Sequence, residues 1–407
     1  MKDWQTCGSS EGMLMEYDWI VIGNGLTGSA VSYELAATGQ KVLLVDQHAS
    51  PQEATRFSYA GIAYWSGTTA MLKQLCQESQ ERYPRLSAEL DYDIQFRELD
   101  LVLTVAADDH PGAYVERCSQ YLVPLTPLSV DAALDLEPML NPSALSGAFT
   151  VKHGHVKPEN LIAAYNSVFK RLGGAIAVAH VQGLQRQGNR ITGIITDQDT
   201  FSGANVLVSN GALARSLLRA EGIHIRQCFS HAELIETPPL EQQLRTFVMP
   251  MNTQRFDLEA AAGSPEKDAL WDENGHEVVP PILDAGAVQF LDGTIRIGQI
   301  SRVLTDPTAT VDTFASEQAM RDAIGQVLPA LKEVPGTWHG CLVSFCGDRL
   351  PLIGPIPNTE GLHIFSGFSN PFAILPPLAK RYAAYVMGES DDIITRMSPD
   401  RPSLKHE

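Results

Sequence analysis

Residues 18–28 read DWIVIGNGLTG, an apolar run that leads directly into three closely spaced glycines. The stretch from Tyr17 to Ile22 is apolar enough and of the right length for a buried β-strand. Residues 26–38 carry alanine, valine and leucine at helical spacing and are followed by a glycine, which is a helix stop signal. KVLLVD at residues 41–46 has the composition of a second buried strand. Strand, turn, helix and strand in this order predict a βαβ unit whose two strands are parallel.

The three glycines, Gly23, Gly25 and Gly28, match the pattern GxGxxG of dinucleotide-binding folds. In that pattern the first glycine allows a tight turn, the second lets backbone amides approach a pyrophosphate, and the third lets the helix pack closely on the strand. The phosphates then lie at the helix N-terminus, where unpaired N–H groups and the helix dipole favour anions. Asp46 ends the second strand, where a carboxylate can accept hydrogen bonds from ribose hydroxyls. We therefore predict a dinucleotide site; the alternative is a glycine-rich turn that binds no ligand.

The composition is that of a globular protein. The chain has 407 residues, 44% of them hydrophobic, which is enough for two packed domains. Its formal net charge of −18 argues against binding to nucleic acid or to an anionic membrane surface. Six cysteines without a CxxC pair are typical of a reducing compartment. Because no signal-peptide pattern and no apolar run of membrane-spanning length occurs, we expect a cytoplasmic protein without stable membrane insertion.

The rest of the chain mixes strand and helix patterns. Predicted strands cover residues 95–106, 189–197, 204–212, 292–298 and 362–367, and predicted helices cover residues 158–174, 314–331 and 378–388. Residues 252–277 are polar and rich in turn formers, which predicts an excursion over the surface. A βαβ pattern at both ends with antiparallel-like strands between them predicts one domain interrupted by another.

Six blocks of sequence carry a further signal in their order and spacing. They are residues 18–46, EATRFSYAGI (53–62), GHVKPENLIAAY (154–165), VLVSNGALARSLL (206–218), DGTIRIG (292–298), and DRLPLIGP (348–355) followed by GLHIFSGFSN (361–370). Together they resemble the family of FAD-dependent amine and D-amino-acid oxidases, which includes glycine oxidase and sarcosine oxidase. The resemblance runs from Asp18 to about Gly388, almost the whole chain.

The resemblance implies an α/β fold in which a Rossmann-type FAD-binding domain is interrupted by a mainly antiparallel, α+β substrate domain. The FAD-binding domain is expected to comprise residues 17–85, 151–225 and 335–392, and the substrate domain residues 86–150 and 226–334, with an N-terminal extension at 1–16 and a C-terminal tail at 393–407. The residues expected to contact FAD are Gly23, Gly25, Gly28, Asp46, Gln47, Thr55, Arg56, Ser58, Gly61, Asn210, Gly211, Cys341, Asp348, Gly367, Phe368 and Ser369.

The resemblance also implies a reaction. The expected enzyme oxidises the CH–NH bond of a small amine or amino acid by hydride transfer to flavin N5 and passes the electrons to O2, a quinone or another acceptor. Three alternatives stay open. An FAD-dependent dehydrogenase of a 2-hydroxy acid or polyol phosphate uses the same architecture. The second alternative is a catalytically weak protein that binds FAD and acts as a partner of other proteins. A nicotinamide dehydrogenase needs only the first block, although no second GxGxxG is present.

The sequence departs from the family at the position of an arginine that binds the substrate carboxylate. Counting back from Asp348, that position holds Val343, and an apolar side chain cannot make the bidentate pair that a carboxylate requires. Arg296 and Arg302, on and just after DGTIRIG, are the nearest replacements by position. The alternative for both is a solvated surface charge.

Further candidates for the substrate pocket come from the other blocks. Arg349 is expected near the flavin, where its charge would oppose the negative charge that develops on reduction. Phe368 and Phe372 stand where the family has smaller residues and predict a narrower pocket. Tyr64 can flank a substrate amine or pack in the core. Arg56 can approach the flavin or form a structural ion pair.

Cys341, His153 and His155 are candidates for bonding to a cofactor or a metal. In sarcosine-oxidase-like members a cysteine in the register of Cys341 bonds covalently to the flavin, whereas a buried free cysteine is the alternative. His153 and His155 have no second ligand pair at suitable spacing, so we predict no metal site.

Overall fold

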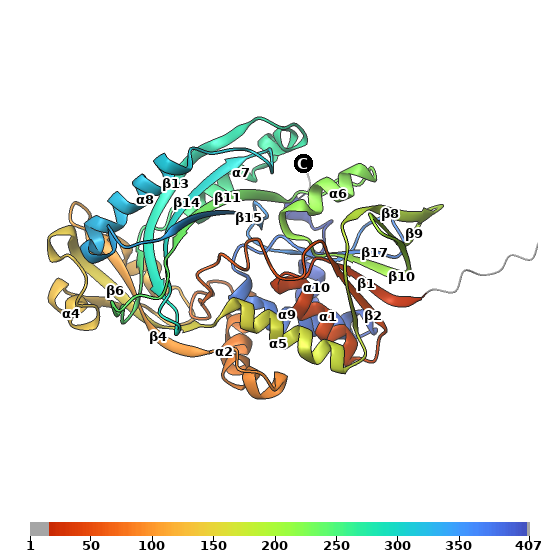
Figure 1. Ribbon diagram of the computed structural model, residues 1–407, viewed down its shortest axis with the longest axis horizontal. Coiled ribbons are helices and arrows are strands. Elements are labelled where there is room, and N and C mark those ends of the chain that lie inside the picture. The colour runs from red at the N-terminus through yellow and green to blue at the C-terminus, as the bar shows by residue number, and fades with distance from the viewer. Residues whose placement is uncertain (1–15, 405–407) are drawn as a thin grey trace, which may run out of the picture.

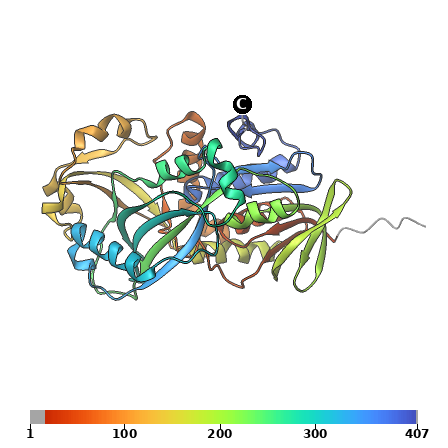
Figure 2. The same cartoon turned by 90° about the horizontal axis from the view of Figure 1, so that it is seen from above.

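The computed structural model describes residues 16–404, which form two β-sheets side by side along the long axis of the molecule (Figure 1). The sheets remain at opposite ends when the molecule is turned by 90° (Figure 2). The predicted N-terminal extension therefore lies outside the described residues, apart from residue 16. No helix within residues 16–404 is long and apolar enough to span a bilayer.

The first sheet confirms the predicted βαβ unit. Its strands are, in spatial order, β16 (Leu352–Pro355), β17 (Leu362–Ser366), β10 (Thr200–Val208), β1 (Tyr17–Ile22), β2 (Val42–Asp46) and β7 (Ala175–Val178), with β8 (Val181–Gln187) and β9 (Arg190–Thr196) continuing from β10. β1 lies in the centre and pairs in parallel with both β2 and β10. Ile20 and Val21 are buried on opposite faces of β1, which explains why this strand reads as a continuous apolar run.

Helices cover one face of this sheet. They are α1 (Leu26–Ala37), α5 (Pro158–Arg171) and α9 (Pro371–Val386), and α2 (Ala70–Leu90) packs against α9 and α5. α1 lies between α5 and α9 and contacts both (Figure 1). The helix that follows the glycine turn is therefore held on two sides, which fixes the position of its N-terminus.

The second sheet is mainly antiparallel, as predicted. Its strands are, in spatial order, β15 (Thr337–Phe345), β11 (Cys228–Glu236), β14 (Ile295–Leu304), β13 (Glu277–Gln289), β12 (Phe247–Pro250), β4 (Arg97–Ala106), β6 (Leu145–His155) and β3 (Gly61–Ile62), with β5 (Thr126–Leu128) beside β6. Only the β12–β4 pair is parallel. The remaining helices are α3 (Val115–Ser119), α4 (Val130–Leu136), α6 (Ala214–Ala220), α7 (Arg255–Ala262), α8 (Thr313–Val327) and α10 (Asp392–Arg396). α8 packs on β11, β13 and β14.

Sheet membership differs from the predicted domain boundaries in three places. β3 lies in the segment 17–85 that was assigned to the FAD-binding domain, but it pairs with β6 in the second sheet. β15 pairs along its whole length with β11 in the second sheet, whereas the boundary at residue 335 assigned it to the FAD-binding domain. β6 begins at Leu145 and pairs with β4, so the boundary at residue 151 divides one strand. The reason is physical: strand character is a local property, but the choice of partner strand depends on residues far away in sequence.

The prediction of a surface excursion at residues 252–277 was wrong. This segment contains α7 and a 3₁₀ helix at Pro265–Asp272. Leu258 and Ala262 are four positions apart on α7 and are both buried, as is Trp271. The high density of polar and turn-forming residues concealed this short amphipathic helix.

Candidate functional site

A cavity of about 1300 Å³ lies at the junction of the two sheets. On one side it is lined by the turns that follow β1 and β10 and by the end of β2. On the other side it is lined by residues of β4, β11, β12 and β15. A ligand in this cavity would therefore contact both parts of the molecule.

The glycine turn after β1 is shaped by close backbone contacts. Gly23 has a φ of +103°, and a Cβ at this position would lie 2.8 Å from the Cα of Asn210. A Cβ on Gly28 would lie 1.7 Å from the carbonyl oxygen of Gly23, so only glycine allows α1 to approach the turn this closely. A Cβ on Gly25 would meet only the Oγ1 of Thr55, at 3.4 Å. Gly25 therefore leaves open space at the cavity wall.

Polar groups hold the start of α1 in place. Asp46 at the end of β2 accepts a hydrogen bond from the backbone N–H of Asn24 (2.7 Å) and another from that of His48 (2.8 Å). Thr55 Oγ1 accepts from the backbone N–H of Leu26 (3.1 Å). The first backbone N–H groups of a helix have no carbonyl partner within the helix, and they favour an anion. The turn can therefore hold a phosphate group.

Four buried polar atoms on the cavity wall have no hydrogen-bond partner among the described residues. They are the hydroxyl oxygens of Tyr59 and Ser369, the Nε2 atom of His153 and the Oδ1 atom of Asn210. Buried polar groups are nearly always hydrogen-bonded in folded proteins. A ligand with several polar atoms can supply the missing partners.

The two histidines of β6 are neutral donors. Trp65 Nε1 donates to His153 Nδ1 (2.9 Å), which places the imidazole proton on Nε2. Burial lowers the pKa of His153 to about 3. Burial also lowers the pKa of His155, whose Nε2 lies 3.1 Å from the carbonyl oxygen of Tyr59. Within residues 16–404 no group of three or more His, Cys, Asp or Glu side chains is arranged to hold a metal ion.

Most of the sequence-predicted site residues meet at this cavity. Those that line it are Gly23, Gly25, Asp46, Gln47, Thr55, Ser58, Gly61, Asn210, Gly211, Cys341, Arg349, Phe368, Ser369 and Phe372, together with Val343. Those outside its lining are Gly28, Arg56, Tyr64, Arg296, Arg302, Asp348 and Gly367.

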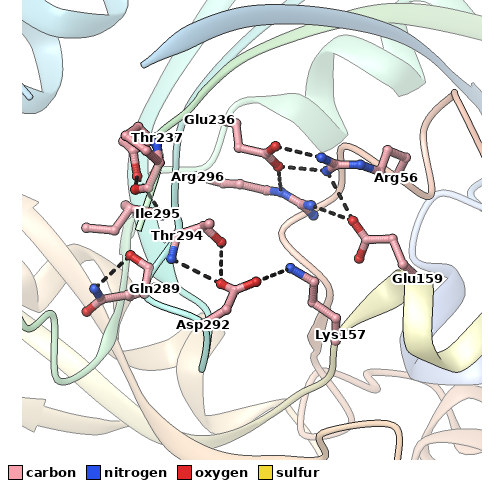
Figure 3. A network of polar contacts seen from close by, with 12 residues as sticks. Arg56, Lys157, Glu159, Glu236, Thr237, Gln289, Asp292, Thr294, Ile295 and Arg296 are labelled. Atoms are coloured by element: carbon pink, nitrogen blue, oxygen red, sulfur yellow. Dashed lines mark hydrogen bonds and ion pairs between the residues drawn. The ribbon is translucent and has the colours of Figure 1, made fainter. Parts of the chain in front are cut away.

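Arg296 and Arg56 are not available to a substrate. Arg296 is completely buried, and its guanidinium contacts Glu236 (2.9 Å), Glu159 (3.2 Å) and the carbonyl oxygen of Ser58 (Figure 3). Arg56 donates two hydrogen bonds to Glu236, at 2.7 and 2.6 Å. This network ties the cavity-lining loop around Ser58 to β11 and α5. Of the two roles considered for Arg56, the structure therefore shows the ion pair.

Arg302 and Tyr64 are also engaged elsewhere. Arg302 donates to Glu233 (2.7 Å) and to the hydroxyl of Ser316 on α8 (3.2 Å). Tyr64 is buried and donates its hydroxyl proton to Glu98. Of the two positions considered for Tyr64, beside a substrate amine or in the core, the structure shows the core position.

Asp348 anchors the C-terminal segment instead of lining the cavity. Its two carboxylate oxygens accept from Nε and Nη2 of Arg401, at 2.7 and 2.8 Å. Arg401 is only 5% exposed, so residues 397–404 are packed into the molecule and hold the turn that carries Arg349.

Sequence reasoning missed several residues of the site. Arg117, Tyr121, Arg255, Phe256 and Asp284 all line the cavity. They come from α3, the loop after it, α7 and β13, none of which lies in a recognised sequence block. No local signal distinguishes them from surface residues, because only the tertiary fold brings them together.

A family model, related sequences and solved structures each match most of this chain. The model of the DAO family, described as FAD dependent oxidoreductase, matches residues 18–385. Glycine oxidase from Pseudomonas aeruginosa is 24% identical over 389 residues, which cover 92% of this chain and 96% of that protein. The crystal structure of glycine oxidase from Geobacillus kaustophilus shares the fold, with a TM-score of 0.77 at 18% identity over 95% of this chain and 98% of that one. L-proline dehydrogenase from P. horikoshii shares it with a TM-score of 0.75 at 18% identity, over 95% and 97% of the two chains.

Proposed function

Because the chain belongs to the DAO family of FAD-dependent oxidoreductases, we propose that it oxidises the CH–NH bond of a small amine or amino acid. The observation that supports this most directly is the single cavity that continues from the glycine turn into the space against the second sheet. It offers room for a dinucleotide cofactor and, beside it, for a small substrate. FAD is the cofactor of this family.

The residues on the cavity wall fit FAD. The turn from Gly23 to Gly28 and the start of α1 would hold its pyrophosphate, and Asp46 would accept from its ribose. The unpartnered atoms of Asn210 and Ser369 lie on the same wall and suit the polar edges of such a ligand. When bound, FAD supplies the two-electron oxidation by accepting a hydride from the substrate carbon.

The cavity-lining residues on the side of the second sheet would hold the substrate and exclude water. The space against the second sheet is lined by Leu101, Leu103, Phe247 and Met249, which keep its dielectric low. The neutral state of His153 means that it can donate a hydrogen bond but is not a base near neutral pH. Such a site favours oxidation of a neutral amine, for which correct positioning matters more than proton abstraction.

Anaerobic reduction of the bound flavin tests the proposal. The purified protein should show the visible absorption of oxidised flavin, and amines or amino acids should bleach it faster than 2-hydroxy acids or polyol phosphates do. Reoxidation by air and by a quinone would then identify the electron acceptor. Bleaching only by hydroxy acids would replace the proposed reaction by CH–OH oxidation, and no bleaching by any donor would favour a catalytically weak FAD-binding protein.

We expect the flavin to be bound without a covalent link to Cys341. Burial raises the pKa of Cys341 to about 12, so its sulfur remains a thiol near neutral pH, whereas the thiolate is the nucleophile. Acid precipitation of the protein should release all flavin into the supernatant, and Cys341→Ser should retain the wild-type flavin content. A yellow pellet that becomes colourless in the variant would contradict this expectation.

A further inference from the structure

Three arginines that lie far apart in the sequence line the cavity. Val343 lines the cavity, but it cannot bind a carboxylate. Arg117 on α3, Arg255 on α7 and Arg349 after β15 line it as well. Arg255 is committed to the protein, because it donates to Glu259 (2.7 Å) and to the carbonyl oxygen of Ser369. Arg117 and Arg349 each use only one guanidinium nitrogen in hydrogen bonds to the described residues.

Each of these arginines is anchored through one of its own nitrogen atoms to the cavity-lining segment at residues 251–257. Nη2 of Arg117 donates to the carbonyl oxygen of Met251 (2.9 Å). Nη2 of Arg349 contacts the carbonyl oxygen of Phe256 (3.3 Å) and the carboxylate of Asp257 (3.2 Å). Within residues 16–404 the Nε and Nη1 atoms of both arginines have no hydrogen-bond partner. Each guanidinium therefore keeps donors for a ligand.

Tyr121 lies in the loop just after α3, the helix that carries Arg117. Its ring packs edge-on against Trp65, with centroids 5.1 Å apart, and it lines the cavity. Burial raises the pKa of Tyr121, and the charges of Arg117 and Arg349 both oppose that rise. All three residues line the same cavity, and both positive charges act on the tyrosine.

The backbone of Arg349 is unusual. Its φ of +65° lies in the left-handed region, which is rare for residues other than glycine and is maintained only where the surroundings impose it. The surroundings here are the backbone hydrogen bond from Arg349 to Cys346 (2.9 Å) and the clamp of Arg401 on Asp348. The Arg349 side chain is half exposed, and its partner Asp257 is 87% exposed, so this ion pair is readily exchanged for a ligand.

We propose that Arg117 and Arg349, with the hydroxyl of Tyr121, bind the carboxylate of an amino-acid substrate whose apolar side chain packs on Leu101, Leu103, Phe247 and Met249. This assignment rests on the proposed function and refines its substrate class from an amine or amino acid to an amino acid with a large apolar side chain. The carboxylate is held from α3 and from the turn after β15, and not from strand β15 itself.

Ligand binding to the FAD-loaded protein tests the assignment. The probes are hexanoate and its neutral counterpart hexanamide, and the readout is the change in flavin absorbance on titration. Wild type should bind hexanoate more tightly than hexanamide. Arg117→Met and Arg349→Gly should each weaken hexanoate binding by about 10-fold or more, because each removes a charge-assisted interaction, and should leave hexanamide binding unchanged.

The variants are chosen to separate binding from folding. Glycine is favoured at a positive φ, so Arg349→Gly should keep the wild-type melting temperature and flavin content. Arg186→Met removes the same charge from an exposed position on β8 and should change nothing. Equal binding of the two probes by wild type, or unchanged hexanoate affinity in both arginine variants, would overturn the assignment. Arginine-dependent hexanoate binding in a protein that no amino acid reduces would instead contradict the proposed reaction and leave the anion site standing.

Discussion

Gly28→Val is expected to give a protein that purifies without flavin and unfolds at a lower temperature than wild type. A Cβ at this position would lie 1.7 Å from the carbonyl oxygen of Gly23 and 2.8 Å from Oγ of Ser209. The contact with the backbone of Gly23 cannot be relieved unless α1 moves away from β1, which would displace the helix N-terminus from the cavity. We expect a loss of stability at the upper end of the roughly 1–3 kcal/mol that is typical of overpacking. Absorbance gives the flavin-to-protein ratio, and calorimetry gives the stability.

Gly25→Ala is the matched control for this experiment. Its Cβ would meet only Thr55 Oγ1, at 3.4 Å, which is ordinary van der Waals contact. The variant should therefore fold with wild-type stability in the absence of FAD but bind FAD more weakly, because the methyl group points into the cavity wall. Stoichiometric flavin in both variants would show that the cofactor does not lie on this turn.

Glu236→Gln is expected to reduce the free energy of unfolding by about 3–5 kcal/mol, the usual result of breaking a buried ion pair from one side. Glu236 lies between the guanidinium groups of Arg56 and Arg296, and Arg296 has no exposed surface (Figure 3). Glutamine keeps the shape of the side chain but leaves the buried charge of Arg296 and the partly exposed charge of Arg56 facing the single carboxylate of Glu159. Urea denaturation with saturating FAD measures the change.

The same variant should alter the acid dependence of stability. Burial by itself raises the pKa of Glu236, but hydrogen bonds and charge from Arg56 and Arg296 outweigh burial and lower the pKa to about 2. The pKa in the unfolded chain is about 4.3, so the contribution of Glu236 is complete above that pH and is lost as the pH falls towards 2. Glu236→Gln should therefore flatten the stability profile in this window.

An exposed ion pair is the control for the buried network. Lys152 Nζ lies 2.9 Å from Asp100 Oδ1, and the lysine side chain is 66% exposed. Lys152→Gln should cost less than about 1 kcal/mol, as is usual for surface ion pairs. A loss of similar size in both variants would contradict the view that burial makes the Glu236 network important.

The part of the cavity wall formed by the glycine turn could be predicted from residues close together in sequence. Gly23, Gly25 and Asp46 lie within one βαβ unit, and the geometry of such a unit is set by strand length, turn residues and helix periodicity. The loop residues Thr55 and Ser58, which were predicted to contact FAD, line the same cavity. Their positions follow from a pattern that is repeated throughout a family of related sequences.

The substrate half could not be predicted in the same way. Arg296 and Arg302 were chosen because they lie on or near a strand of the second sheet, but sequence position does not reveal that Glu236 and Glu233 occupy them. Arg117 and Arg349 are 232 positions apart in the chain. Both line the same cavity because α3 and the turn after β15 each contact the segment at residues 251–257.

The sequence by itself determined the βαβ unit and the glycine turn, because these depend on local spacing along one short stretch. FAD was implied only by the resemblance of six blocks along almost the whole chain. Only the tertiary structure decided which charges are buried in pairs and which are left facing the cavity. Pairing depends on the register of strands that are distant in sequence, and a guanidinium that finds a carboxylate in the folded core is no longer available to bind a ligand.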